Sequence, residues 1–217
     1  VKFAGQTWRI VRVNEDGTIR IVMQDGINNN AKYAFNSNSN NYTYMYYTNS
    51  QAKTQLESWY KTNIGSKKDL ASSVASGAYY CDQASVKESD RYTSGNATIT
   101  TYTSYIPDFK CSSDGNGKGI VNASIGLLNY DEVVYAGGYL VQSNNNYYLY
   151  NPSINWWTMS PAGFSGSSSV VWYVNIAGRI SNANASGTGH LRPVIIMTAD
   201  IQISDGDGTI NSPFVVE

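Results

Sequence analysis

The order of strand-like and helix-like segments is the feature that most restricts the fold of this chain. Helical spacing of apolar residues is confined to the first two thirds, whereas β-branched and aromatic residues dominate beyond residue 144. Six strand-like stretches follow there: residues 147–150, 156–160, 169–175, 178–181 and 191–198, and a terminal hairpin that turns at residues 205–208. Because helices and strands are segregated rather than alternating, the sequence predicts an α+β fold with a C-terminal antiparallel sheet.

The N-terminal region has the pattern of a β-hairpin. Residues 6–14 and 18–24 are rich in β-branched side chains, and the Glu-Asp-Gly sequence at 15–17 is typical of a turn. We expect Trp8, Ile10 and Val13 to face the core. Residues 28–49 contain many Asn and Tyr without a clear period, which indicates a long loop or irregular ribbon.

Two or three short helices are predicted between the hairpin and the final strands. Thr48 and Gln51 form a possible capping box for the first helix, whose apolar residues recur at helical spacing before Gly65. A second helix is expected at residues 67–76, ended by Gly77, and a short strand at 78–81. One or two further helical turns are expected within residues 125–135.

The charge balance of the chain argues against several classes of partner. Lys and Arg number 15 and Asp and Glu 16, so there is no basic surface for nucleic acid or anionic lipid. Only 14% of the residues are charged, while 18 Tyr, 19 Gly and many Asn and Ser give a composition like that of antibody binding loops. This composition favours recognition through neutral polar and aromatic groups.

We expect residues 1–217 to form a single domain excised from a longer surface protein. A length of 217 residues fits one core, and no linker or internal repeat divides the chain. The sequence starts at Val1 without a charged leader and has no apolar run of about 20 residues, so no membrane insertion by this segment is expected. Cys81 and Cys111 are the only cysteines, and they form either a disulfide or a reduced, buried pair.

The chain offers no residue pattern typical of an enzyme. His190 is the only histidine, so neither a histidine metal site nor a catalytic triad has its usual partners. The glycine-rich residues 115–119 and 163–167 fail the phosphate-loop and nucleophile-elbow patterns. Asp205, Asp207 and Thr209 alternate with glycine and offer possible Ca²⁺ ligands, but a tight hairpin is favoured because the downstream Glu of a calcium loop is missing. No cofactor is therefore expected.

Three segments carry a resemblance to a known fold. These are Asn155-Trp156-Trp157-Thr158-Met159-Ser160-Pro161, Gly189-His190-Leu191-Arg192-Pro193-Val194-Ile195 and Trp8-Arg9-Ile10-Val11. Their order resembles the C-type-lectin-like fold in its formylglycine-generating-enzyme-like form, in which an Arg-bearing final strand closes a small sheet. The two cysteines do not match the catalytic pair of that enzyme family, which implies a structural role for them.

A narrower resemblance rests on residues 125–127, 136–138, 191–195 and 205–209. These stretches are similar to an uncharacterised surface-protein family of Gram-positive gut bacteria, which implies a prepilin-like or membrane-anchored N-terminus. Related lectin-fold proteins are the variable adhesins of diversity-generating retroelements. The resemblance implies that residues 165–190 form such a variable region.

Tryptophan placement leads to the predicted binding surface. Alternation on a strand sends Trp156 and Trp157 to opposite faces, so one is expected in the core and the other on an exposed recognition surface; alternatively, both pack beneath loops. The predicted ligand-binding residues are Trp157, Ser165, Ser167, Trp172, Tyr173, Asn175, Arg179, Ser181, Asn182, Asn184 and His190.

Two functions remain open at this point. The first is an extracellular, adhesin-like module on the cell surface or a pilus that binds a host or bacterial surface protein or a glycan. The second is a structural pilin or surface-layer subunit without a small ligand.

Overall fold

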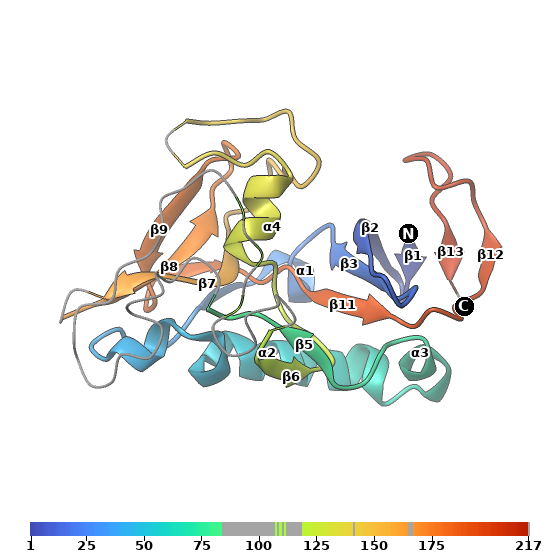
Figure 1. The fold of residues 1–217 in the computed structure, drawn as a ribbon, viewed down its shortest axis with the longest axis horizontal. Coiled ribbons are helices and arrows are strands. Elements are labelled where there is room, and N and C mark those ends of the chain that lie inside the picture. Colours follow the sequence, from blue (N-terminus) through green and yellow to red (C-terminus); the bar gives the residue numbers. More distant parts are fainter. Residues whose placement is uncertain are drawn as a thin grey trace.

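The computed structural model describes residues 1–83, 107, 109, 111, 119–140, 142–164 and 167–216, and its fold is α+β. Its strands are β1 (Lys2–Phe3), β2 (Gln6–Val13), β3 (Ile19–Met23), β4 (Lys32–Ala34), β5 (Ala78–Tyr80), β6 (Val121–Ala123), β7 (Trp156–Phe164), β8 (Ser169–Val174), β9 (Ile180–Asn184), β10 (Thr188–His190), β11 (Val194–Met197), β12 (Ile203–Asp205) and β13 (Val215–Val216). A six-stranded sheet has the order β11-β3-β2-β1-β13-β12, a five-stranded sheet the order β4-β10-β7-β8-β9, and β5 pairs with β6. Figure 1 shows the two larger sheets side by side, with helices along one side of both.

The first sheet is built on the predicted N-terminal hairpin, which is confirmed: β2 pairs antiparallel with β3. Trp8 is buried as expected, but the expectation that Val13 faces the core is wrong, since Val13 is 65% exposed. The pairing of β2 with β3 shifts register between Ile10 and Arg12. Because of this bulge Val13 lies opposite Ile19 and on the same face as Trp8 and Ile10, so its exposure follows from its place at the end of the hairpin rather than from the face it occupies.

The second sheet buries its central strand on both faces. Trp156 and Trp157 of β7 do point to opposite faces, yet each is 1% exposed. The Arg192 guanidinium covers the Trp156 ring at 4.7 Å, and Phe35 and Tyr173 contact Trp157 with ring centroids 5.8 Å away. The alternative in which both tryptophans are packed therefore holds.

The helical segments are short, and three of them begin at a polar side-chain cap, supplied by Asn41, Ser50 and Asn129. They are α1 (Ile27–Asn30), η1 (Tyr42–Met45), η2 (Tyr47–Asn49), α2 (Gln51–Tyr60), η3 (Lys61–Gly65), α3 (Lys68–Ser72) and α4 (Tyr130–Tyr135). The predicted Thr48 cap is wrong, because the Ser50 hydroxyl accepts the Lys53 N–H and Thr48 instead donates to Asp82. The strand predicted at residues 147–150 is not formed, whereas β4 and β10 lie in segments predicted as loops.

A buried ion pair joins the first sheet to α4. Arg20 Nη2 on β3 donates to Glu132 Oε2 on α4 (3.0 Å), and the ion pair brings Arg20 Nε within 2.5 Å of Glu132 Oε1. The Glu132 carboxylate also accepts the Asn129 N–H, completing a capping box at the start of α4. The ion pair thus holds the N-terminal end of α4 against β3.

Cys81, directly after β5, forms a disulfide with Cys111. The glycine-rich residues 115–119 lie outside the described residues except for Gly119. Within the described part of the chain, none of the helices is both long and apolar enough to span a bilayer.

Candidate functional site

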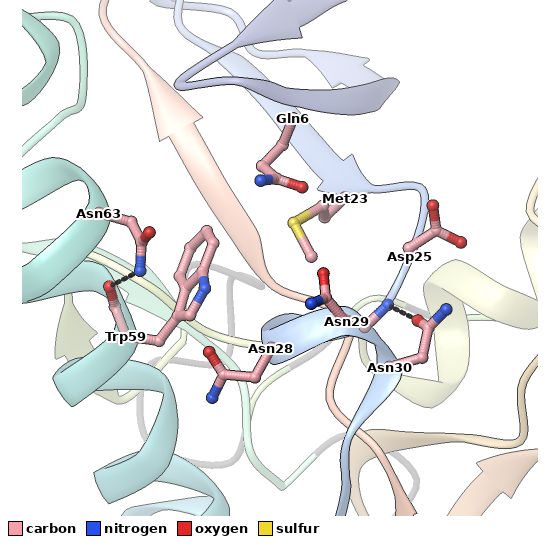
Figure 2. A pocket seen from close by; sticks show the side chains of 9 residues that line it. Gln6, Met23, Asp25, Asn28, Asn29, Asn30, Trp59 and Asn63 are labelled. Carbon is pink, nitrogen blue, oxygen red and sulfur yellow. Dashed lines mark hydrogen bonds between the residues drawn. The ribbon is translucent and has the colours of Figure 1, made fainter.

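A polar pocket of about 440 Å³ opens between β2 and β3 of the first sheet, the α1 turn and the α2–η3 helical segment. It is lined by Gln6, Met23, Asp25, Gly26, Asn28, Asn29, Asn30, Trp59 and Asn63. We call it the asparagine pocket. Figure 2 shows the amide side chains around a floor formed by the Met23 thioether and the Trp59 indole. Its volume lies within the roughly 300–1,000 Å³ usual for small-molecule sites.

One wall of the pocket is a left-handed turn formed by three consecutive asparagines. Asn28, Asn29 and Asn30 have φ angles of +51°, +55° and +61°. This conformation costs an L-residue roughly 1–2 kcal/mol, although Asn tolerates it better than most residues, and it normally occurs at single positions. Backbone strain of this kind clusters at functional sites, where the surrounding structure enforces it.

Contacts on both sides hold the left-handed turn. The Gly26 N–H donates to the Asn30 side-chain oxygen (2.6 Å), and the Ile27 N–H donates to the Leu191 carbonyl (3.0 Å). Ile27 is fully buried, which anchors the start of the turn in the core. The Asn28 amide donates to the Tyr33 hydroxyl (2.7 Å) on β4. The turn is therefore formed before any ligand arrives.

His190 and Trp157, both predicted as ligand contacts, lie behind the asparagine turn and support it. A Cβ on Gly26 would lie 3.2 Å from the His190 Cβ, so glycine allows the turn to pack directly on His190. His190 is held by its ring Nδ1 beside the Asn155 carbonyl (2.6 Å). The Trp157 indole N–H donates to the Tyr33 carbonyl (3.1 Å). This bond positions Tyr33 on β4, and the Tyr33 hydroxyl accepts from Asn28.

The opposite wall comes from the end of the longest helical segment. Trp59 lies on α2 and contacts the Trp8 ring, with centroids 6.5 Å apart. Asn63 lies on η3, a π-helical turn, and its amide donates to the Trp59 carbonyl (2.8 Å). Single π-helical turns are frequent at functional sites because the extra residue redirects side chains. Here η3 turns Asn63 toward the pocket.

Several polar groups of the pocket have no partner among the residues that the structure describes. Among the described residues, the side-chain amides of Gln6 and Asn29 form no hydrogen bond. Asn28 and Asn63 each use only their amide nitrogen, and Asn30 uses only its oxygen. The pocket thus presents both donors and acceptors, and Asp25 is the single charged residue of its lining.

The predicted binding surface is only partly exposed. Trp172 is 3% exposed because its ring packs on Tyr130 of α4 (centroids 5.3 Å), and His190 is 6% exposed. With Trp157, these residues are corrected from surface contacts to core residues. Replacing Trp172 therefore tests folding rather than binding.

The remaining predicted residues lie on β8, β9 and their connections. Tyr173 and Ser181 are half-buried and pair across the two strands, and Asn182 and Asn184 are exposed. The Asn175 side chain accepts from the turn that joins β8 to β9, and the Arg179 guanidinium donates to the Leu140 carbonyl. Ser167 is exposed, whereas Ser165 lies outside the described residues. None of these residues lines the asparagine pocket.

Sequence reasoning missed the asparagine pocket because residues 28–49 were interpreted as an irregular loop. One signal was available: Asn is the residue most tolerant of left-handed backbone after Gly, and three in succession follow Gly26 and Ile27. Gln6, Trp59 and Asn63 gave no comparable signal, since only the tertiary structure brings them to the turn.

No protein-family model, curated protein or solved structure matches this chain. Within the described residues, no group of three or more His, Cys, Asp or Glu side chains is placed to hold a metal ion. The function therefore has to be argued from the pocket itself.

Proposed function

We propose that this chain is an extracellular ligand-binding module of a bacterial surface, adhesin-like and without catalytic activity. One observation carries the proposal: a left-handed asparagine turn is held by hydrogen bonds at the wall of a pocket in which several amide groups have no partner among the described residues. A preformed site of this kind avoids the entropic cost of ordering a loop when the ligand binds. Its ligand, a surface protein or a glycan, is held by hydrogen bonds rather than by ion pairs.

The C-type-lectin-like architecture belongs to the same proposal. Two observations support it. Arg192 is buried, and the strand that directly follows it, β11, pairs with β3 of the N-terminal hairpin. Diversification of residues 165–190 stays a prediction.

The proposal is tested by probing glycan and surface-protein arrays with the whole chain and two matched variants. Asn29→Gly removes an amide from the pocket but suits the left-handed backbone, and Asn182→Ala removes an exposed amide from β9. We expect array binding to be lost in Asn29→Gly and kept in Asn182→Ala. The reverse result would move the site to the surface predicted from sequence, and silence of the parent chain on both arrays would count against a binding module.

A second candidate, a structural subunit that packs on copies of itself, is favoured by an apolar groove of about 480 Å³. Tyr135 and Tyr148 line it and are 76% and 55% exposed, and Ile210 in the β12–β13 connection is 92% exposed. Exposed apolar surface of this kind is typical of protein contacts.

Sedimentation over a wide concentration range tests self-association. The structural-subunit hypothesis requires concentration-dependent assembly that Tyr135→Ser weakens. A monomer at all concentrations would exclude it.

A further inference from the structure

We infer that the asparagine pocket takes a neutral saccharide and binds it without a metal ion. This inference rests on the proposed function, because it names the ligand class of the same site. It is carried by the charge of the lining, by the hydrogen-bonding groups left free, and by the shape of the site.

The charge of the lining disfavours acidic ligands. No Lys, Arg or His is among the nine lining residues, and the exposed Asp25 carboxylate lies at the pocket. A ligand carboxylate, sulfate or phosphate would approach a like charge and would meet no cation among the lining residues; the Arg192 guanidinium, which interacts electrostatically with Asp25, is buried and donates to the Met23 carbonyl. A neutral ligand meets no such penalty.

The free hydrogen-bonding groups match hydroxyls. A side-chain amide offers an acceptor oxygen and a donor NH₂ side by side, and a hydroxyl both donates and accepts. The free oxygens of Asn28 and Asn63, the free NH₂ of Asn30 and the whole amides of Gln6 and Asn29 give the pocket both kinds of group. A ligand with acceptors alone would leave the free amide oxygens unpaired. Each oxygen that is desolvated without a partner weakens binding by about 1–3 kcal/mol.

The exposed lining of the pocket is mainly polar, which suits a ligand covered with hydroxyls. Met23 and Trp59 are 2% and 6% exposed, so they leave little apolar surface open between the amides. Figure 2 shows the Trp59 indole between Asn63 and Asn28, with its nitrogen on the side of Met23. Within the described part of the chain that indole N–H has no hydrogen-bond partner, so it is a further donor to a ligand.

The shape of the site argues against a peptide. Extended peptides add to a sheet edge, helical peptides lie in apolar grooves, and acidic motifs meet clusters of arginine. At the pocket, Gln6 and Met23 already pair within the first sheet, and the walls are polar side chains from a turn and a helix end. Recognition here depends on separate polar groups, as for a small polyhydroxylated ligand.

Metal-free binding follows from the donor set. Ca²⁺ takes six to eight oxygen ligands, usually with several carboxylates. Asp25 is the single carboxylate that lines the pocket. We therefore expect EDTA to leave binding unchanged.

The experiment is calorimetric titration of the whole chain with free neutral hexoses, N-acetylhexosamines and their oligomers. The same series is run with sialylated and uronic-acid saccharides, each with Ca²⁺ and with EDTA. We expect neutral saccharides to bind in both buffers and acidic ones to bind at least about tenfold more weakly. Asn29→Gly should weaken neutral binding by about tenfold or more, a change of about 1.4 kcal/mol. Asp25→Asn should narrow the gap between acidic and neutral saccharides.

Asn122→Ala, an exposed asparagine on β6, is the matched control and should bind like the parent chain. Preference for acidic saccharides, loss of binding in EDTA, or no saccharide bound up to millimolar concentration would each overturn the inference. If a surface protein binds and Asn29→Gly abolishes that binding while saccharides do not bind, the proposed function stands and the saccharide assignment fails. If Asn29→Gly alters the binding of no ligand, both fail.

Discussion

Asn29 lies at the centre of the left-handed turn, and its side chain forms no hydrogen bond with the described residues. The effect of its left-handed backbone on stability can therefore be measured separately from the contact of its side chain with a ligand. Asn29→Ala should lower the free energy of unfolding by about 1 kcal/mol, because a Cβ disfavours positive φ and alanine lacks the local polar contacts that help asparagine.

Asn29→Gly should instead leave stability unchanged or raise it slightly, because glycine adopts this conformation freely. Urea unfolding of the two variants measures the difference. Equal stability of the alanine and glycine variants would contradict the left-handed assignment.

Asp82 is the residue whose ionisation should make stability depend on pH. It is 1% exposed; its Oδ2 accepts from the Thr48 N–H and hydroxyl, and its Oδ1 has no partner among the described residues. Burial raises the pKa of Asp82 above its usual value of 3.8. The folded state then binds this proton more tightly than the unfolded state, so the contribution to stability is present at low pH and is lost as pH rises through the folded pKa.

Asp82→Asn should therefore raise the free energy of unfolding at pH 7, by on the order of 1 kcal/mol, and lose this advantage below pH 3.8. Thermal unfolding from pH 3 to pH 8 tests the sign. An advantage that grows toward acid pH would show that the carboxylate, rather than the carboxylic acid, is favoured in the fold.

At the scale of elements, α4 and the first sheet are joined by charge as well as by packing. Glu132 and Arg20 are 4% and 2% exposed, and the Arg20 guanidinium also lies over the Tyr80 ring at 4.9 Å. Glu132→Gln keeps an acceptor for the Asn129 N–H but leaves a buried guanidinium without its full partner. We expect a loss of about 3–5 kcal/mol, as for other broken buried pairs.

The matched control is the solvent-accessible pair Lys53–Glu57 on α2, joined at 2.6 Å. Glu57→Gln should cost less than about 0.5 kcal/mol, because solvent screens an i,i+4 surface pair. Denaturant unfolding of both variants compares the two environments, and equal losses would contradict a special role for the buried pair.

For the whole molecule, the Cys81–Cys111 disulfide constrains a separation of 30 residues. Removing it from a loop of this length should lower stability by about 3–4 kcal/mol, chiefly by enlarging the unfolded ensemble. Cys81→Ser with Cys111→Ser, measured by guanidinium unfolding beside the reduced and oxidised parent, tests this. An unchanged unfolding midpoint in the reduced parent would show that the bridge adds nothing to the fold.

The sequence by itself determined much of the regular structure. The apolar periodicity and turn residues were enough for the N-terminal hairpin, for α2 and for β7, β8 and β11, because these elements reflect local patterns. It did not yield β4 and β10, each three residues long, because strands this short have too few residues to establish a period. Val13 was misassigned because a strand pattern indicates the face of a residue but not how far along the strand that face is covered.

The tertiary structure alone decided where the site lies. Trp157, Trp172 and His190 have the residue types of a recognition surface, but Phe35, Tyr130 and the asparagine turn cover them from distant parts of the chain. The pocket joins residues from positions 6 to 63, and its wall adopts a left-handed turn that Asn permits without requiring. Burial of Ile27 and the hydrogen bond from its N–H to Leu191 select that conformation, and such long-range contacts exist only once the chain has folded.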